Sequence, residues 1–121
     1  MTVSAGYQTF VLDQLRRVLP AVRANRMFGA VGLYANELFF AVIDDDVLYL
    51  KVDDATRPDF EERGLRPFQP FGDDRVSMQY YQLPEDVLED PEALRPWAEN
   101  AVAAARRAKQ KKTKSGGKKK R

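Results

Sequence analysis

The chain has 121 residues, of which 44% are hydrophobic and 31% charged, a size and balance typical of one globular domain with its own core. It contains neither cysteine nor histidine, which excludes disulfides, thiolate nucleophiles, imidazole bases and Cys or His metal ligands. No apolar run is long enough to span a bilayer and the N-terminus lacks a secretory pattern, so we expect a cytoplasmic protein without membrane contact.

The first predicted element is an amphipathic helix from Tyr7 to Leu19. Its apolar residues recur at intervals of three and four, Ser4 can cap its start, and Pro20 ends it.

Three strands are predicted next, at residues 26–35, 38–43 and 47–52. Two glycines, Gly29 and Gly32, indicate a bulge or a close backbone approach in the first of them. The connections between the strands are short turns, which predicts an antiparallel meander.

The second half of the chain begins with a short capped helix, predicted at residues 55–63. Residues 65–71 contain two prolines, so any strand there should be broken or lie at a sheet edge. In residues 75–82, Val76, Met78 and Tyr80 alternate with Ser77, Gln79 and Tyr81, the pattern of a strand with one wet face.

Two further helical segments close the folded part. One helical turn is expected at residues 84–88. Asp90-Pro91 then opens a longer helix, whose apolar stripe contains Leu94, Trp97 and Ala101.

The order of elements determines the predicted fold class. Strands grouped in hairpins favour an α+β fold with an antiparallel sheet of about five strands, in the order α-β-β-β-α-β-β-α. We expect one domain at residues 1–108 and a disordered basic tail at residues 109–121, because that tail is too polar and like-charged to pack.

The net charge of +2 conceals a strong segregation of charge. Residues 106–121 hold ten cations and no acid, which leaves ten basic and 18 acidic residues in the rest of the chain. Such a tail binds DNA or RNA without sequence preference, only solubilises the protein, or else contacts membrane headgroups or an acidic body. The ten cations are Arg106, Arg107, Lys109, Lys111, Lys112, Lys114, Lys118, Lys119, Lys120 and Arg121.

Few residues could carry catalysis, and we assign no catalytic residue, metal site or cofactor. Lys51 is the only lysine before the tail and could pair with Ser77 in a Ser-Lys dyad, but a lysine at a strand end is the ordinary case. The acidic run at residues 44–46 lacks the spacing of a calcium loop. The glycines at 29 and 32 lack the lysine of a phosphate-binding loop.

Aromatic residues are a further candidate. Trp97 and the pairs Phe39-Phe40 and Tyr80-Tyr81 could stack bases, but no basic residue interleaves with them in the sequence. Core packing is therefore the predicted role, and Trp97 is expected to pack the last helix onto the sheet.

The strand at residues 38–43 is apolar on both alternating faces. If all helices lie on one side of the sheet, its second face needs a partner, and a twofold homodimer is the simplest one. Alternatively, the first and last helices lie on opposite faces and cover both. The two predicted sets are Leu38, Phe40 and Val42 on one face and Phe39, Ala41 and Ile43 on the other.

Several short motifs, taken together, resemble the N-terminal domain of the TfoX/Sxy family. The resemblance covers about residues 7–107 and implies a compact α+β domain similar to secretion-chaperone-like folds. The motifs are Arg26-Met27-Phe28-Gly29, Gly32-Leu33-Tyr34, Leu48-Tyr49-Leu50-Lys51-Val52, Arg57-Pro58, Met78-Gln79-Tyr80-Tyr81, Pro84, and Asp90-Pro91-Glu92-Ala93-Leu94 with Trp97.

The resemblance also implies a function. Fuller members of the family resemble bacterial regulators of competence and DNA transformation, which act as transcriptional co-activators with the cyclic-AMP receptor protein and are not known as enzymes. They carry a second, helical domain where this chain has its basic tail. The implied role is a non-enzymatic regulatory domain with a protein partner such as a transcription factor, and the matched residues are expected to be structural. The alternative is a small enzyme or ligand-binding domain that uses Lys51 and nearby carboxylates.

Overall fold

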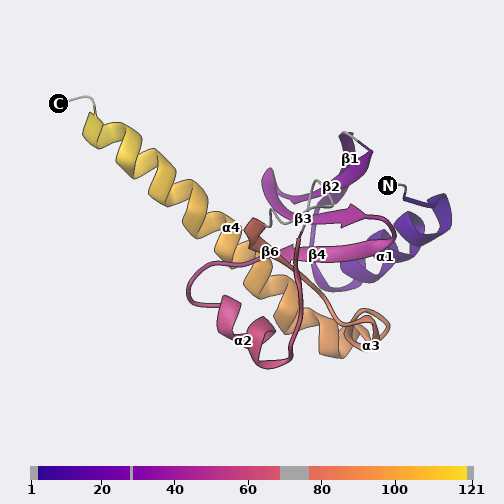
Figure 1. The fold of residues 1–121 in the computed structure, drawn as a ribbon. Coiled ribbons are helices and arrows are strands. Elements are labelled where there is room, and N and C mark those ends of the chain that lie inside the picture. The colour runs from indigo at the N-terminus through magenta and orange to yellow at the C-terminus, as the bar shows by residue number, and fades with distance from the viewer. Residues whose placement is uncertain (1–2, 28, 69–76, 120–121) are drawn as a thin grey trace.

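A six-stranded antiparallel sheet organises the computed structural model, which describes residues 3–27, 29–68 and 77–119 (Figure 1). The strands lie in the order β1-β2-β3-β4-β6-β5. The α+β class and the antiparallel sheet are confirmed, with one strand more than the five expected. The strands are β1 (Val22–Met27), β2 (Ala30–Ala35), β3 (Leu38–Asp44), β4 (Val47–Lys51), β5 (Pro67–Phe68) and β6 (Ser77–Gln82).

The additional strand is β1, and the prediction of a single strand at residues 26–35 was wrong. Gly29, with a φ of 83°, lies in the turn that separates β1 from β2. The sequence of β1, VRANRM, is half polar, and the strand lies at a sheet edge and pairs only with β2. Val22 and Ala24 alternate with polar residues, but Arg26 interrupts the alternation, so the strand pattern is short.

Both long helices cover the same face of the sheet (Figure 1). These are α1 (Ala5–Val18) and α4 (Pro91–Lys119), which contact each other, while α1 also contacts β1 and α4 also contacts β3 and β4. The alternative in which they cover opposite faces is thus excluded. Two short helices, α2 (Arg57–Glu62) and α3 (Glu85–Leu88), lie at the periphery.

The core lies between these two helices and the sheet. Leu15 of α1 and Leu94 of α4 are fully buried against Phe40 and Leu50 from the sheet. Each such side chain stabilises the fold by about 1.5–3 kcal/mol relative to exposure. The core therefore uses only one face of the sheet, and the other face, called the open face below, is not covered by a helix in the described part of the chain.

A β-bulge decides which residues of β3 face the core. Tyr34 pairs with Phe39 and Leu33 pairs with Ala41, so Phe40 has no partner in β2. The strict alternation predicted for residues 38–43 was consequently wrong beyond Phe40. In the structure Leu38, Phe40, Ala41 and Ile43 belong to the core, whereas Phe39 and Val42 lie on the open face.

The faces of β6 also differ from the prediction. Tyr81 pairs with Leu50 and is only 2% exposed in the core, whereas Tyr80 pairs with Lys51 on the open face. The predicted alternation placed Tyr80 with the apolar set and Tyr81 with the polar one. Side-chain burial here follows the register with β4, which the sequence pattern does not contain.

Helix α4 begins at an N-cap and runs far beyond the sheet (Figure 1). Asp90 Oδ1 accepts a hydrogen bond from the Glu92 N–H at 3.1 Å, as expected of a cap. At its other end the structure gives helical backbone to residues 109–119, where composition predicts disorder. The lysines and the glutamine of this segment have high helix propensity, whereas Thr113, Ser115 and the two glycines do not.

Candidate functional site

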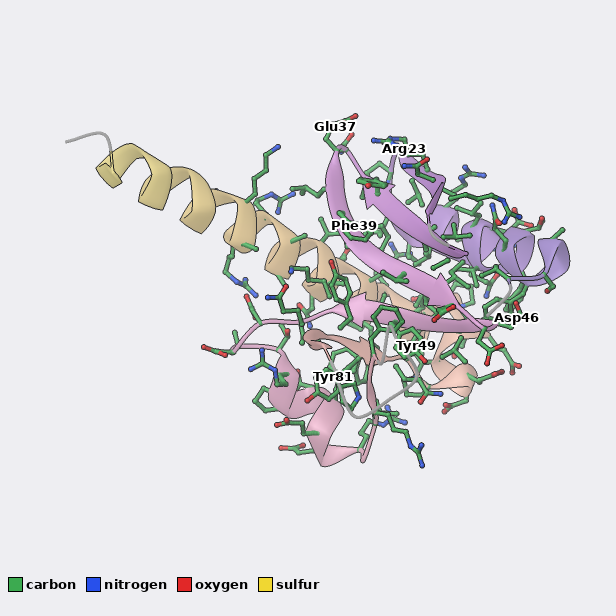
Figure 2. All side chains as sticks on the ribbon, turned by 45° about the horizontal axis from the view of Figure 1, so that its top comes forward. Arg23, Glu37, Phe39, Asp46, Tyr49 and Tyr81 are labelled. Atoms are coloured by element: carbon green, nitrogen blue, oxygen red, sulfur yellow. The ribbon has the colours of Figure 1, made fainter. Side chains whose placement is uncertain are left out.

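Three aromatic side chains form a row on the open face. Tyr34 of β2 stacks on Phe39 of β3 with ring centroids 5.1 Å apart, and Phe39 lies 5.7 Å from Tyr80 of β6. Figure 2 shows Phe39 near the middle of the sheet, on the side away from the long helices. All three rings are half-buried, and each pair contributes about 0.5–1.5 kcal/mol beyond its buried area.

A cation lies against each of the two tyrosine rings, Arg23 from β1 at the sheet edge and Lys51 from β4, the strand between Phe39 and Tyr80. The guanidinium carbon of Arg23 is 4.3 Å from the centroid of Tyr34, and Lys51 Nζ is 5.1 Å from the centroid of Tyr80. Contacts of this kind stabilise exposed sites by about 0.5–1 kcal/mol. The five side chains come from five different strands, and we call them the aromatic row: Arg23, Tyr34, Phe39, Tyr80 and Lys51.

Both cations also form polar contacts. Arg23 forms an ion pair with Glu37 at 3.4 Å, and Lys51 Nζ donates a hydrogen bond to Gln79 Oε1 at 3.0 Å. Burial lowers the pKa of Lys51, and the carboxylate of Asp53 partly offsets this. Burial of the Tyr80 hydroxyl, with a smaller contribution from Tyr34, raises the pKa of Tyr80 to about 12. At neutral pH the Tyr80 ring is therefore uncharged.

The charge changes sign along the open face. Tyr49 packs against Phe68 with centroids 4.8 Å apart, toward the turn between β3 and β4. Burial, then the carboxylates of Asp44 and Asp45, raise the pKa of Tyr49. Figure 2 shows Tyr49 on the same side of the molecule as Asp46 in this acidic turn. The open face thus has a cationic end at the aromatic row and an acidic end at Tyr49.

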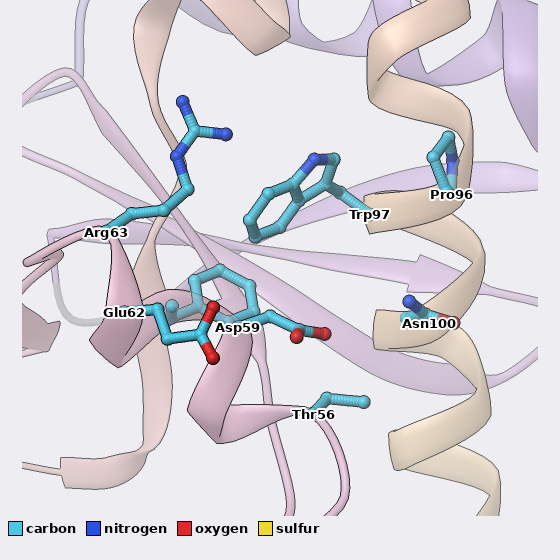
Figure 3. Close-up of a pocket in the computed structure, with 8 residues that line it drawn as sticks. Thr56, Asp59, Glu62, Arg63, Pro96, Trp97 and Asn100 are labelled. Carbon is cyan, nitrogen blue, oxygen red and sulfur yellow. The ribbon is translucent and has the colours of Figure 1, made fainter.

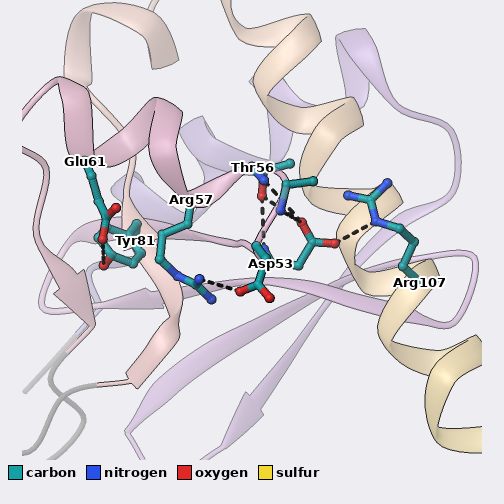
Figure 4. A network of polar contacts seen from close by, with 8 residues as sticks. Asp53, Thr56, Arg57, Glu61, Tyr81 and Arg107 are labelled. Carbon is teal, nitrogen blue, oxygen red and sulfur yellow. Dashed lines mark hydrogen bonds and ion pairs between the residues drawn. The ribbon is translucent and has the colours of Figure 1, made fainter.

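Residues 106–121, called the basic segment below, are attached to the domain at their start. Arg107 Nε donates to Asp53 Oδ2 at 2.6 Å, and Asp53 Oδ1 accepts from the N–H groups of Ala55 and Thr56 (Figure 4). The hydrogen bond from Arg107 is the main reason that the pKa of Asp53 is lowered. Asp53 is two positions after Lys51, so the ion pair lies just beyond the end of β4.

The predicted nucleic-acid-binding cations have different surroundings. Arg107 is engaged by Asp53, Arg106 lines a pocket of about 260 Å³ beside the loop between α1 and β1, and Lys109 is exposed on α4. Residues 111–119 are described as helical backbone without their side chains, and Lys120 and Arg121 lie outside the described residues. Among these cations, Arg107 thus forms an ion pair with Asp53 of the domain.

Trp97 packs differently from the prediction. It meets Phe60 of α2 edge-on at 4.8 Å, and Phe60 in turn lies 5.9 Å from Tyr81 of the sheet. Trp97 therefore attaches α4 to α2, and Phe60 connects this contact to the sheet. Arg63 covers the indole at 5.5 Å.

A pocket of about 330 Å³ opens beside Trp97, between α2 and α4 (Figure 3). Its acidic residues, Asp59 and Glu62, are exposed to solvent. The pocket offers an aromatic wall and exposed carboxylates, without a nucleophile held against a buried base. Its lining consists of Thr56, Asp59, Phe60, Glu62, Arg63, Pro96, Trp97 and Asn100.

The other residues of the family motifs have structural surroundings. Gly32 pairs with both Asn25 and Val42 inside the sheet, Pro58 lies in the first turn of α2, and Pro84 directly precedes α3. Arg26 is exposed on β1, which ends at Met27, and Tyr81 donates from its hydroxyl to Glu61 at 3.1 Å (Figure 4). Phe28 lies outside the described residues.

The described residues contain neither a metal-binding cluster nor a membrane-spanning helix. Within them, no three acidic side chains come together in a way that would hold a metal ion. Within them, too, no helix combines the length and apolar character needed to cross a membrane. The side chain of Ser77, the predicted partner of Lys51, is not described.

Comparisons with known proteins agree with the fold. Residues 13–105 match the TfoX N-terminal domain, a span that contains all six strands and ends one residue before the basic segment. A protein of Spirochaeta aurantia, described as an uncharacterized 12.7 kDa protein in the trpE 5′ region, is 31% identical over 115 residues, which cover 95% of this chain and 94% of that protein. With most of its length matched, this chain belongs to the TfoX N-terminal domain family.

Proposed function

We propose that this protein is a non-enzymatic regulatory domain that contacts nucleic acid through residues 106–121 and acts on transcription together with a protein partner. The observation that carries the proposal is the ion pair between Asp53 and Arg107 at the point where α4 leaves the sheet. It anchors the helix whose cationic part extends away from an acidic body. The family membership supports a competence-regulator-like role.

The physical basis of this contact is the release of counterions. Each phosphate that a lysine or arginine neutralises lowers the slope of log K against log salt by about 0.9. Cations on one extended segment read phosphates and not base edges, so the contact is independent of sequence. The role of the segment is thus to raise the local concentration of the domain on nucleic acid.

The contacts of Lys51 favour a regulatory role over the alternative of a small enzyme. Its Nζ donates to the Gln79 side chain and lies against the Tyr80 ring, which are contacts of a positioned cation. A catalytic lysine needs a base or a reacting group within hydrogen-bond reach. Its acidic neighbour Asp53 is engaged by Arg107 and by two backbone N–H groups.

Duplex binding at increasing salt tests the nucleic-acid part. The full chain is compared with a variant in which Lys109, Lys111, Lys112 and Lys114 are replaced by glutamine, using the fluorescence anisotropy of a labelled duplex. We expect weaker binding and a shallower salt slope, by about 0.9 for each lost contact. A variant with Arg17 and Arg95, two exposed cations outside the segment, changed to glutamine serves as the control. Equal binding by the two variants would contradict the proposal.

Affinity capture from the native cell tests the protein partner. Capture is performed with and without nuclease, using the full chain and the glutamine variant. A transcription factor or polymerase subunit retained after nuclease treatment supports the proposed role. Capture of proteins only through nucleic acid would contradict a direct protein partner.

A further inference from the structure

The aromatic row has the side chains of a single-strand binding surface in one place. Three rings from β2, β3 and β6 form a contiguous series, with a cation against each tyrosine ring. Proteins that bind single strands combine aromatic side chains, on which bases stack, with cations that contact the phosphates. The sequence alone does not show this combination of rings and cations, because Arg23 and Lys51 are distant in the chain from the rings that they contact.

At the sheet-edge side of the row, the Arg23 guanidinium covers the Tyr34 ring, and a nucleobase could replace it there. The Arg23 guanidinium is flat, lies 4.3 Å from the ring, and belongs to a side chain that is 50% exposed. Its partner Glu37 is 77% exposed, so their ion pair is weak. Arg23 can therefore leave the ring for a phosphate while a nucleobase takes its stacking position.

Charge determines where a strand lies on this face. The row contains two cations, whereas the Tyr49 end of the same face adjoins Asp44 and Asp45 and repels phosphates. The Asp53–Arg107 pair attaches the start of the basic segment to the chain two positions after Lys51. A strand is therefore favoured along the row and toward α4.

We propose that the aromatic row binds single-stranded nucleic acid, with bases stacked on Tyr34, Phe39 and Tyr80 and phosphates bound by Arg23 and Lys51. The bases of a duplex are stacked on each other and present only their edges in the grooves, so the rings select unpaired strands. The inference rests on the proposed function in that both place the domain on nucleic acid, and it adds a preference for single strands.

A second copy of this chain is the competing occupant of the open face. In a twofold dimer through this face, two rows that each contain Arg23 and Lys51 would lie against each other. Two like charges in apposition disfavour that pairing, whereas a polyanion neutralises both. The charges of the row therefore favour nucleic acid over self-association.

The test compares single-stranded and duplex oligonucleotides of about 12 nucleotides, within the usual site sizes, by fluorescence anisotropy with the full chain. We expect tighter binding of the single strand. Phe39→Leu and Tyr34→Leu keep apolar bulk but remove the stacking ring, and each should weaken single-strand binding about tenfold without changing duplex binding. Tyr49→Leu, the same change at the acidic end of the open face, is the matched control and should alter neither.

Substitution of the cations provides a second readout. Arg23→Gln and Lys51→Gln should each reduce the salt slope for the single strand by about 0.7, whereas Arg17→Gln should not. Thermal melting verifies that each variant is folded, and because Tyr34 and Arg23 lie toward the sheet edge, their variants remain informative if Phe39→Leu unfolds.

Three outcomes would overturn the proposal. They are equal affinity for single strand and duplex, equal losses for Phe39→Leu and Tyr49→Leu, and a doubled mass in sedimentation equilibrium that Phe39→Glu abolishes. The last would assign the face to a second copy. Duplex binding reports on the basic segment and the single-strand preference on the row, so failure of one is distinguishable from failure of the other.

Discussion

Asp53 and Arg107, 54 positions apart in the chain, form an ion pair of 2.6 Å between Oδ2 and Nε. The pair joins the loop after β4 to α4 at the point where this helix leaves the sheet (Figure 4). Asp53 also accepts hydrogen bonds from two backbone N–H groups of its own loop. The two partners therefore contribute unequally to stability, because only Asp53 has this second role.

Alanine substitutions should reveal this inequality. Asp53→Ala is expected to lower the free energy of unfolding by about 1–2 kcal/mol, since it removes both the ion pair and the acceptor for the loop N–H groups. Arg107→Ala removes only a half-exposed ion pair and should cost about 0.5–1 kcal/mol. Urea unfolding measures both, with Arg106→Ala on the adjacent helix position as the control. Equal losses for Asp53→Ala and Arg107→Ala would contradict this assignment.

The same pair predicts a dependence of stability on acid. The pKa of Asp53 is lowered in the folded protein from its ordinary value of 3.8, so its stabilising contribution is complete above that value. The contribution is lost as the pH falls through the lower, folded pKa. Urea unfolding at a series of pH values should show this loss in the wild-type chain and a smaller one in Arg107→Ala. Identical acid profiles for the two proteins would refute it.

The bulge in β3 predicts which substitutions damage the core. Under strict alternation Phe40 and Ile43 would lie on opposite faces, but the bulge places both in the core, fully buried. Phe40→Ala should therefore cost about 3–5 kcal/mol and Ile43→Ala about 2–5 kcal/mol. Phe39→Ala, on the half-buried open face, should cost about 1–2 kcal/mol. A small effect of Ile43→Ala, measured by thermal unfolding, would speak against the bulge.

The contact between Phe60 and Trp97 predicts which of the two alanine substitutions lowers the free energy of unfolding more. Phe60 is 3% exposed and contacts both Trp97 and Tyr81, so Phe60→Ala should cost about 3–5 kcal/mol. Trp97 is half-buried beside a pocket, and Trp97→Ala should cost about 2–3 kcal/mol. Trp97 is also the only tryptophan, so Phe60→Ala should shift its fluorescence toward that of an exposed indole. Unchanged emission would show that the two rings do not pack.

Local patterns in the sequence determined much of this fold. The cap at Ser4, whose Oγ accepts from the Tyr7 N–H at 3.2 Å, and the cap at Asp90 were both predicted from adjacent residues. The edge position of the proline-containing strand β5 was predicted in the same way. Each of these features depends on residues a few positions apart, where side-chain chemistry acts directly on the backbone. The α+β class and the family follow from the order of such segments.

Only the tertiary structure decided which distant residues meet. The aromatic row requires the register of five strands, and a single unpaired residue, Phe40, changes which side chains of β3 face the core. The pairing of Arg107 with Asp53 likewise depends on how α4 crosses the sheet. A sequence pattern records the period of a strand but neither its register nor its bulges, and one inserted residue reverses the side to which every later side chain points. The fold class of the domain can therefore be predicted from the sequence, whereas its candidate site is formed only by the pairing of the strands.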